Sequence, residues 1–233
     1  MIKACLFDLD GTVLDTIKSI AHYGNLALKE FGVEPIETSK YNFFAGNGAK
    51  MLIKRMLEYR SCYSEELFSK VYPFYIQSYD ANPTYLTEPF EGICELLKTL
   101  NKAGINSAVI SNKPDFAARS VCKEKFDEGL FKLVRGQVDG VKIKPDTEGA
   151  FLVMKELGVT SEEILYIGDT DVDMQTGKNL GAYTVGVLWG FRGKEELITN
   201  GADELVAYPM EIAHIIERKN KKNLKKSKKS IDN

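Results

Sequence analysis

The chain has 233 residues, 44% of them hydrophobic, which is enough for one large domain or for a medium domain that carries a smaller one. Its formal net charge of -2 gives no general reason to expect nucleic-acid binding. No window of about 18 apolar residues occurs, so we expect no membrane span, and the four cysteines lack the spacing of a zinc site. Met1-Ile2-Lys3 leads directly into a short apolar stretch without the pattern of a secretory signal. These features predict a cytoplasmic protein.

Short apolar segments alternate with helical patterns along most of the chain. Strands are predicted at residues 4–9, 106–110, 130–134, 164–167 and 183–187. Between them, apolar residues recur at helical spacing, as in Ile93, Leu96, Leu97 and Leu100. This alternation predicts an α/β fold with a Rossmann-like parallel sheet core.

The segment after the first strand breaks the alternation. Residues 16–82 show only helical spacing, with helices expected around residues 17–31, 52–57 and 68–79. We therefore predict an all-helical cap at 16–82, inserted into a discontinuous core made of residues 1–15 and 83–217. An insert at this point lies over the carboxyl end of the first strand, where open α/β sheets bind ligands.

The C-terminal residues 218–233 differ in composition from the rest of the chain. Residues 219–229 contain seven lysines in eleven positions. A run of like charges with little apolar content is typical of a solvated end, so we predict a basic, disordered tail.

Acidic residues gather where the first predicted strand ends. Asp8 and Asp10 flank Leu9, and Asp15 follows after Gly11-Thr12-Val13-Leu14. Carboxylates concentrated at one strand end raise the free energy unless a cation balances them. Oxygen ligands suit a hard ion, so this cluster indicates magnesium.

A second acidic cluster follows the strand predicted at residues 164–167. Asp169, Asp171 and Asp173 match the first three ligand positions of a helix–loop–helix calcium loop. However, Met174 stands where that loop needs glycine and Leu180 where it needs glutamate, so the calcium-loop interpretation fails.

Two further segments offer groups that bind phosphate. Ser111 and Asn112 close the strand predicted at residues 106–110 with a hydroxyl and an amide, which are neutral donors for phosphate oxygens. Lys144, before Pro145, offers positive charge ahead of a predicted helix.

The ordered set of these motifs resembles that of the haloacid dehalogenase-like hydrolases. The resemblance covers roughly residues 1–190 and rests on four motifs in order: Asp8-x-Asp10-Gly11-Thr12-x-x-Asp15, Ser111, Lys144-Pro145 and Gly168-Asp169-x-x-x-Asp173. It implies a magnesium-dependent phosphatase. Asp8 would be the nucleophile and a metal ligand. Asp10 would protonate the leaving alcohol and later activate water, and its main-chain carbonyl would also contact the metal.

The resemblance also implies roles for the later motifs. Ser111 and Lys144 would bind the transferring phosphoryl oxygens. Gly11, Thr12 and Asn112 are further candidates for phosphate binding. Asp169 would be a direct metal ligand, and Asp173 would bind the metal's outer shell or position Lys144.

The predicted cap contains a segment similar to the glycine-containing cap loop of phosphoglycolate phosphatases. Its candidate substrate-selecting residues are Gly46, Asn47, Gly48, Lys50 and Arg55. Backbone groups of this loop, with Lys50 or Arg55, would meet a substrate carboxylate, although the two cations also fit a solvated helix face.

We therefore predict a phosphatase acting on a small phosphorylated metabolite of the phosphoglycolate type, with Mg²⁺ as cofactor and with no nucleic-acid or membrane partner. The alternatives on the same fold are a pyrophosphatase, a nucleotide or sugar phosphatase, a sugar-phosphate mutase and a non-catalytic phosphate-binding protein. The intact Asp10 argues against a pure binder, which has no use for an acid/base group. The sequence leaves monomer and dimer open.

Overall fold

The computed structural model describes the backbone of residues 1–231 and the side chains of residues 1–222. Its core is a six-stranded parallel sheet with the order β5-β4-β1-β6-β7-β8. The strands are β1 (Ala4–Phe7), β4 (Asn106–Pro114), β5 (Leu133–Gln137), β6 (Ile164–Gly168), β7 (Tyr183–Val187) and β8 (Glu204–Val206). The predicted parallel α/β sheet is confirmed. The short edge strand β8 was not predicted, and β4 runs four residues further than its apolar segment.

The central strand β1 is buried on both faces because helices cover the two sides of the sheet. The helices α5 (Ile93–Lys102), α6 (Asp115–Lys125) and α10 (Met210–Ile231) pack on one side, with Cys5 and Phe7 of β1. The helices α7 (Glu148–Leu157) and α8 (Asp171–Leu180) pack on the other, with Ala4 and Leu6. The short helices η1 (Ser161–Glu163) and α9 (Lys194–Thr199) lie in connections. The alternating side chains of one strand thus contribute to two separate cores.

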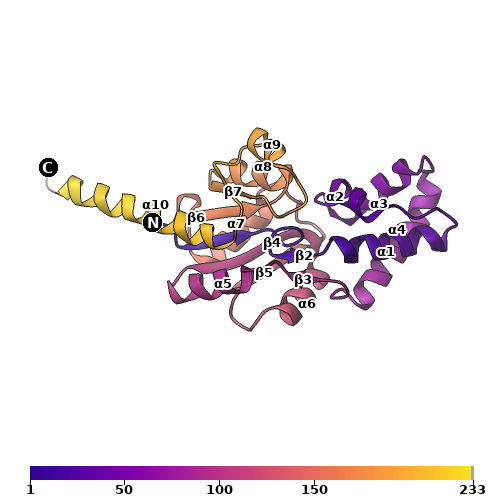
Figure 1. Cartoon of the computed structure of the whole chain (residues 1–233), viewed down its shortest axis with the longest axis horizontal. Coiled ribbons are helices and arrows are strands. Elements are labelled where there is room, and N and C mark those ends of the chain that lie inside the picture. Colours follow the sequence, from indigo (N-terminus) through magenta and orange to yellow (C-terminus); the bar gives the residue numbers. More distant parts are fainter. Residues whose placement is uncertain (232–233) are drawn as a thin grey trace.

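Four helices between β1 and the rest of the sheet form a second unit at one end of the molecule (Figure 1). They are α1 (Ile17–Glu30), α2 (Thr38–Phe44), α3 (Gly48–Tyr59) and α4 (Glu65–Ala81). Their apolar side chains form their own cluster, which includes Tyr41, Ile53 and Met56. Two short antiparallel strands, β2 (Leu14–Asp15) and β3 (Glu88–Pro89), flank this insert where the chain leaves the sheet and returns to it. Helix α2 was not predicted.

The C-terminal segment corrects one prediction. Helix α10 continues to Ile231 and projects from the end of the molecule opposite to α1–α4, so residues 218–231 are helical rather than a disordered tail (Figure 1). Lysine has a high helix propensity, and the first turns of α10 are already anchored by Ile212, Ile215 and Ile216. The last two residues of the predicted tail lie outside the described residues. Within residues 1–231, no helix is long and apolar enough to cross a membrane.

Candidate active site

The chain turns sharply where β1 ends, at the carboxyl edge of the sheet. Asp8 follows the strand directly, and the backbone N–H groups of residues 12, 13 and 14 all lie within hydrogen-bond distance of the Leu9 carbonyl. Gly11 has a φ of 90°, and a Cβ there would lie 2.3 Å from Oδ2 of Asp169. Only glycine fits this backbone at this contact. Thr12 was predicted to bind phosphate, but its buried hydroxyl donates a hydrogen bond to Oδ1 of Asp169 at 2.9 Å.

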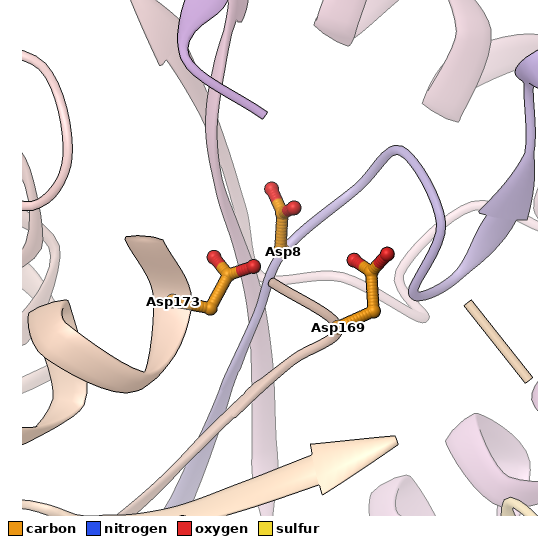
Figure 2. A group of neighbouring side chains, drawn as sticks. All are labelled: Asp8, Asp169 and Asp173. Carbon is orange, nitrogen blue, oxygen red and sulfur yellow. The ribbon is translucent and has the colours of Figure 1, made fainter. Parts of the chain in front are cut away.

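Three carboxylates meet at this edge of the sheet. Asp8, Asp169 and Asp173 each place an oxygen within 4.8 Å of the other two, and all three are buried (Figure 2). Asp169 is held by the Thr12 hydroxyl and by the backbone N–H of Phe191, which donates to Oδ2 at 2.8 Å. Burial and the neighbouring charges of Asp173 and Asp8 raise the pKa of Asp169 well above its usual value.

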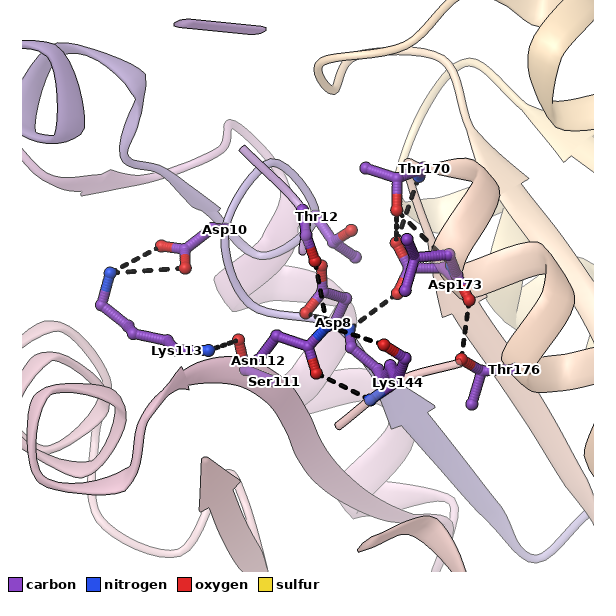
Figure 3. A network of polar contacts seen from close by, with 12 residues as sticks. Asp8, Asp10, Thr12, Ser111, Asn112, Lys113, Lys144, Thr170, Asp173 and Thr176 are labelled. Carbon is purple, nitrogen blue, oxygen red and sulfur yellow. Dashed lines mark hydrogen bonds and ion pairs between the residues drawn. The ribbon is translucent and has the colours of Figure 1, made fainter. Parts of the chain in front are cut away.

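Lys144 is the cation that balances this cluster from the protein side. Its Nζ lies 2.6 Å from Oδ1 of Asp8 and 2.7 Å from Oδ1 of Asp173 (Figure 3). Burial alone lowers the pKa of Lys144, but the charges of Asp173 and Asp8 outweigh it and raise that pKa well above its usual value. The same burial, with repulsion from Asp173, raises the pKa of Asp8 to about 7 despite the attraction of Lys144. One ammonium group therefore does not compensate three buried carboxylates.

Asp173 is placed by the first turn of α8. Its Oδ2 accepts hydrogen bonds from the backbone N–H and the hydroxyl of Thr170, at 3.1 and 2.6 Å, and its other oxygen faces Lys144. This reciprocal cap satisfies the start of the helix and orients the carboxylate at the same time. Of the two predicted roles for Asp173, the geometry shows the contact that positions Lys144.

The end of β4 brings Ser111 and Asn112 beside Lys144. Ser111 is buried and borders the cavity above Asp8. The Asn112 amide donates to the carbonyls of Gly46 and Lys144, at 3.0 and 3.1 Å, and its Oδ1 accepts from the Lys144 backbone N–H at 2.8 Å. The side-chain amide of Asn112 thus holds the Lys144 loop and the insert together, while the residue lines the cavity, and its phosphate binding stays a prediction.

A cavity lies between the sheet edge and the helical insert. Asp8, Asp10 and Ser111 line its floor, and α1, α3 and α4 contribute apolar walls: Ile20, Ala49, Leu52, Tyr75, Ile76 and Tyr79. Asp10 points to a different neighbour from the other acids. Its two oxygens lie 3.0 and 3.3 Å from Nζ of Lys113 (Figure 3).

No role for Lys113 or Tyr79 was predicted from the sequence. Lys113 lies two positions after Ser111 in β4, which is irregular between Ile110 and Pro114, and Ser111, Asn112 and Lys113 all line the cavity. The position of Lys113 directly after Ser111 and Asn112 was the available indication. Tyr79 lies at the end of the helix predicted at residues 68–79, and no sequence pattern points to its contact with Lys113.

The cap loop reaches the cavity through its glycines. Gly46 and Gly48 line the cavity, and both have positive φ values, 110° and 79°. Asn47 lies between them as the N-cap of α3 and is not among the lining residues.

The two predicted cap cations lie elsewhere. Lys50 is exposed, with Nζ 6.0 Å from the ring centroid of Tyr72. The guanidinium of Arg55 donates to the carbonyl of Phe44 at 3.0 Å, where α2 ends. The structure therefore does not bring Lys50 or Arg55 into the cavity.

Comparison with known proteins agrees with this site. Residues 5–187 match the family described as haloacid dehalogenase-like hydrolases. The chain belongs to this family. Among its relatives in the family, a phosphoglycolate phosphatase of Aquifex aeolicus is 30% identical over 190 residues, which cover 82% of this chain and 86% of the relative. An N-acetylmuramic acid 6-phosphate phosphatase of Pseudomonas aeruginosa is 27% identical over 220 residues, covering 93% of this chain and 96% of the relative.

Solved structures show the same architecture. The crystal structure of a candidate phosphoglycolate phosphatase from Lactobacillus delbrueckii subsp. bulgaricus has a TM-score of 0.87 at 29% identity, and covers 92% of this chain and 98% of that one. A β-phosphoglucomutase of Clostridium difficile, at 20% identity and a TM-score of 0.76, shows the fold alone. This haloacid dehalogenase-like chain is accordingly a phosphatase of the phosphoglycolate phosphatase-like branch.

Proposed function

We propose that this phosphatase hydrolyses a small phosphate monoester in two steps through a phospho-aspartate on Asp8. In the first step a carboxylate oxygen of Asp8 attacks phosphorus, the bond between phosphorus and the ester oxygen breaks, and Asp10 gives its proton to the leaving alkoxide. In the second step Asp10 takes a proton from water, the water oxygen attacks phosphorus, and Asp8 leaves as carboxylate with release of inorganic phosphate.

The observation that carries this proposal is the placement of Asp8 and Asp10 on the floor of one cavity with different partners. Lys144 lies 2.6 Å from Asp8, where it neutralises the nucleophile and faces the phosphoryl oxygens during transfer. Asp10 lies away from the three-carboxylate cluster, which suits a group that must exchange protons with the leaving oxygen and with water. Ser111 supplies a neutral hydroxyl at the same floor.

The donor set suits Mg²⁺. Its members are carboxylate oxygens, and the buried acids carry more negative charge than Lys144 balances. Asp8, Asp169 and the main-chain carbonyl of Asp10 would hold the ion. When bound, it supplies positive charge against the repulsion between the carboxylate nucleophile and the phosphate dianion.

The size of the cavity favours a small leaving group. Its volume is about 60 Å³, and a water molecule needs roughly 10–15 Å³ by the same measure. A leaving group of two or three carbons fits such a space. Together with the relatives named phosphoglycolate phosphatase, this volume supports a phosphoglycolate-like substrate.

We assign residues 16–82 to a cap that closes over a core of residues 1–15 and 83–217. Hydrogen bonds from core side chains reach the insert: Asn112 donates to Gly46, Lys113 to Tyr79, and the Arg192 guanidinium to the Ala45 carbonyl at 3.0 Å. Closure of this kind excludes water from the reacting groups. The cytoplasmic location expected from the sequence stays a prediction.

Release of inorganic phosphate from a panel of esters tests the proposal. The panel contains phosphoglycolate, N-acetylmuramic acid 6-phosphate, a nucleoside monophosphate and pyrophosphate, each with Mg²⁺ and with chelator. We expect phosphoglycolate to react fastest, and we expect the chelator and Asp8→Asn each to abolish turnover. Asp171→Asn is the matched control, because Asp171 lies in the same acidic motif as Asp169 but outside the three-carboxylate cluster. Full activity of Asp8→Asn would rule out the covalent step.

A further inference from the structure

Lys113 is a buried lysine at the boundary between core and cap. Only 8% of its surface is exposed, and its Nζ donates to Asp10 at 3.0 Å and to the Tyr79 hydroxyl at 2.8 Å. Its ammonium also lies 4.4 Å from the centroid of the Tyr79 ring. Burying an ammonium group is unfavourable unless its partners compensate it, so these contacts define a built site for positive charge.

Lys113 is the one basic side chain among the described residues that line the cavity. The other charged residues there are Asp8, Asp10 and Asp80, and the walls are largely apolar. Lys144, the other buried lysine of the site, faces Asp8 and Asp173 below the floor. An anionic group on the leaving side of the substrate therefore has one place in this cavity where it meets a cation.

The hydrogen-bond inventory leaves room for such a group. A lysine ammonium has three N–H donors. Within residues 1–222, the partners of Nζ of Lys113 are the Tyr79 hydroxyl and the two oxygens of Asp10, which lie too close together in one carboxylate to take two separate N–H groups. The third donor is available to a ligand in the cavity.

The position of Asp10 locates that ligand. Asp10 must contact the leaving oxygen in order to protonate it, and Lys113 contacts Asp10. A carboxylate attached one carbon away from the leaving oxygen lies within reach of the same ammonium. Lys50 and Arg55, the cations expected from the sequence to do this, are outside the cavity.

We propose that Lys113 binds the carboxylate of the leaving group and thereby selects phosphorylated 2-hydroxy acids as the substrate class. This inference rests on the proposed phosphatase function. The contact is charge-assisted and lies in a site shielded by the cap, where such a hydrogen bond contributes more than at a surface. Tyr79 orients the ammonium from the cap side, so recognition of the carboxylate is linked to cap closure.

The test compares two esters that differ in one group. Phosphoglycolate carries a carboxylate one carbon from the ester oxygen, and 2-hydroxyethyl phosphate carries a neutral hydroxymethyl group in its place. For Lys113→Met we expect kcat/KM to fall with both esters because Asp10 loses its partner, and to fall about 30-fold further with phosphoglycolate than with 2-hydroxyethyl phosphate, mostly through KM. Lys113→Arg keeps the charge and should recover part of the preference.

Lys123→Met is the control, since Lys123 is an exposed lysine on α6 outside the cavity. Circular dichroism and thermal unfolding check that each variant folds. If Lys113→Met does not fold, the preference of Lys113→Arg between the two esters still tests the inference. An equal loss on both esters would show that Lys113 acts only through Asp10 or the phosphoryl group, and would overturn the inference. A wild-type enzyme that hydrolyses both esters equally well would overturn it too. Failure of the wild type to release phosphate from any ester would instead overturn the proposed function, and this inference with it.

Discussion

Replacing the nucleophile should stabilise the metal-free protein while it removes activity. Asp8 is buried beside Asp173 and Asp169, and burial with the charge of Asp173 raises its pKa from 3.8 to about 7 even though Lys144 attracts it. The folded state therefore disfavours the ionised carboxylate relative to the unfolded chain. Asp8→Asn removes that charge and keeps the shape of the side chain.

The sign and size of the effect follow from this pKa. Because the folded protein holds the Asp8 proton more tightly, the favourable contribution is complete below pH 4 and is lost as the pH rises through about 7. The difference between the unfolded pKa of 3.8 and the folded pKa of about 7 corresponds to about 4 kcal/mol of stability at a pH above both pKa values. The attraction of Lys144 is already contained in this pKa, so we expect Asp8→Asn to gain about 4 kcal/mol at pH 8 in the metal-free protein, or about 8–16 °C in Tm.

Thermal unfolding in chelator, measured from pH 5 to pH 8.5, decides the matter. Asp8→Asn should melt above the wild type at pH 8, and the gap should close toward pH 5, where the wild-type carboxyl is protonated in the folded state. Asp171→Asn should show no such pH-dependent gap. A lower Tm for Asp8→Asn at pH 8, or a gap that does not change with pH, would refute the charge argument.

Three other substitutions test separate parts of the site. Gly11→Ala forces a Cβ to 2.3 Å from Asp169 at a positive φ, so we expect urea unfolding to show a loss of at least about 2 kcal/mol; an unchanged midpoint would contradict this. Lys144→Met leaves Asp8 without its cation, so turnover should vanish and chelator-treated protein should lose about 3–5 kcal/mol at pH 8, less at pH 5. Arg192→Ala removes the contact with the Ala45 carbonyl, so kcat/KM should fall about tenfold, and Tm should fall too because Arg192 is buried and pairs with Glu196; equal kinetics would show that this contact does not hold the cap.

Much of the fold could be predicted because its information is local. The segment 183–187 reads as a strand and is β7 with the same bounds, and the apolar run at 164–167 becomes the buried strand β6. The edge strand β8 was not predicted because it has only three residues, two of them half-buried, and these show no clear alternation of apolar and polar side chains. The disordered tail was predicted from the lysine-rich composition alone. Composition does not show that the preceding turns of α10 are anchored in the core.

The chemistry of the site was indicated by short sequence motifs around Asp8, Asp10, Lys144 and Asp169. A carboxylate at the end of a buried parallel strand must lie at the sheet's carboxyl edge, so its meeting with other strand-end residues follows from chain direction. What the side chains touch there was not predictable. The sequence did not indicate that the side chain of Thr12 bonds to Asp169, or that the side chain of Asn112 bonds to Gly46 and Lys144.

The sequence by itself indicated five of the six strands of the main sheet, the insert after the first of them, and the identity of the acids and of Lys144, because these depend on residue type and on spacing along the chain. Only the tertiary structure decided which cation faces the leaving group. Lys113 and Tyr79 are 34 positions apart and belong to the core and the insert, and their contact exists only when the two units pack together. Lys50 and Arg55 have the right charge in the right loop, but the direction of α3 takes them out of the cavity.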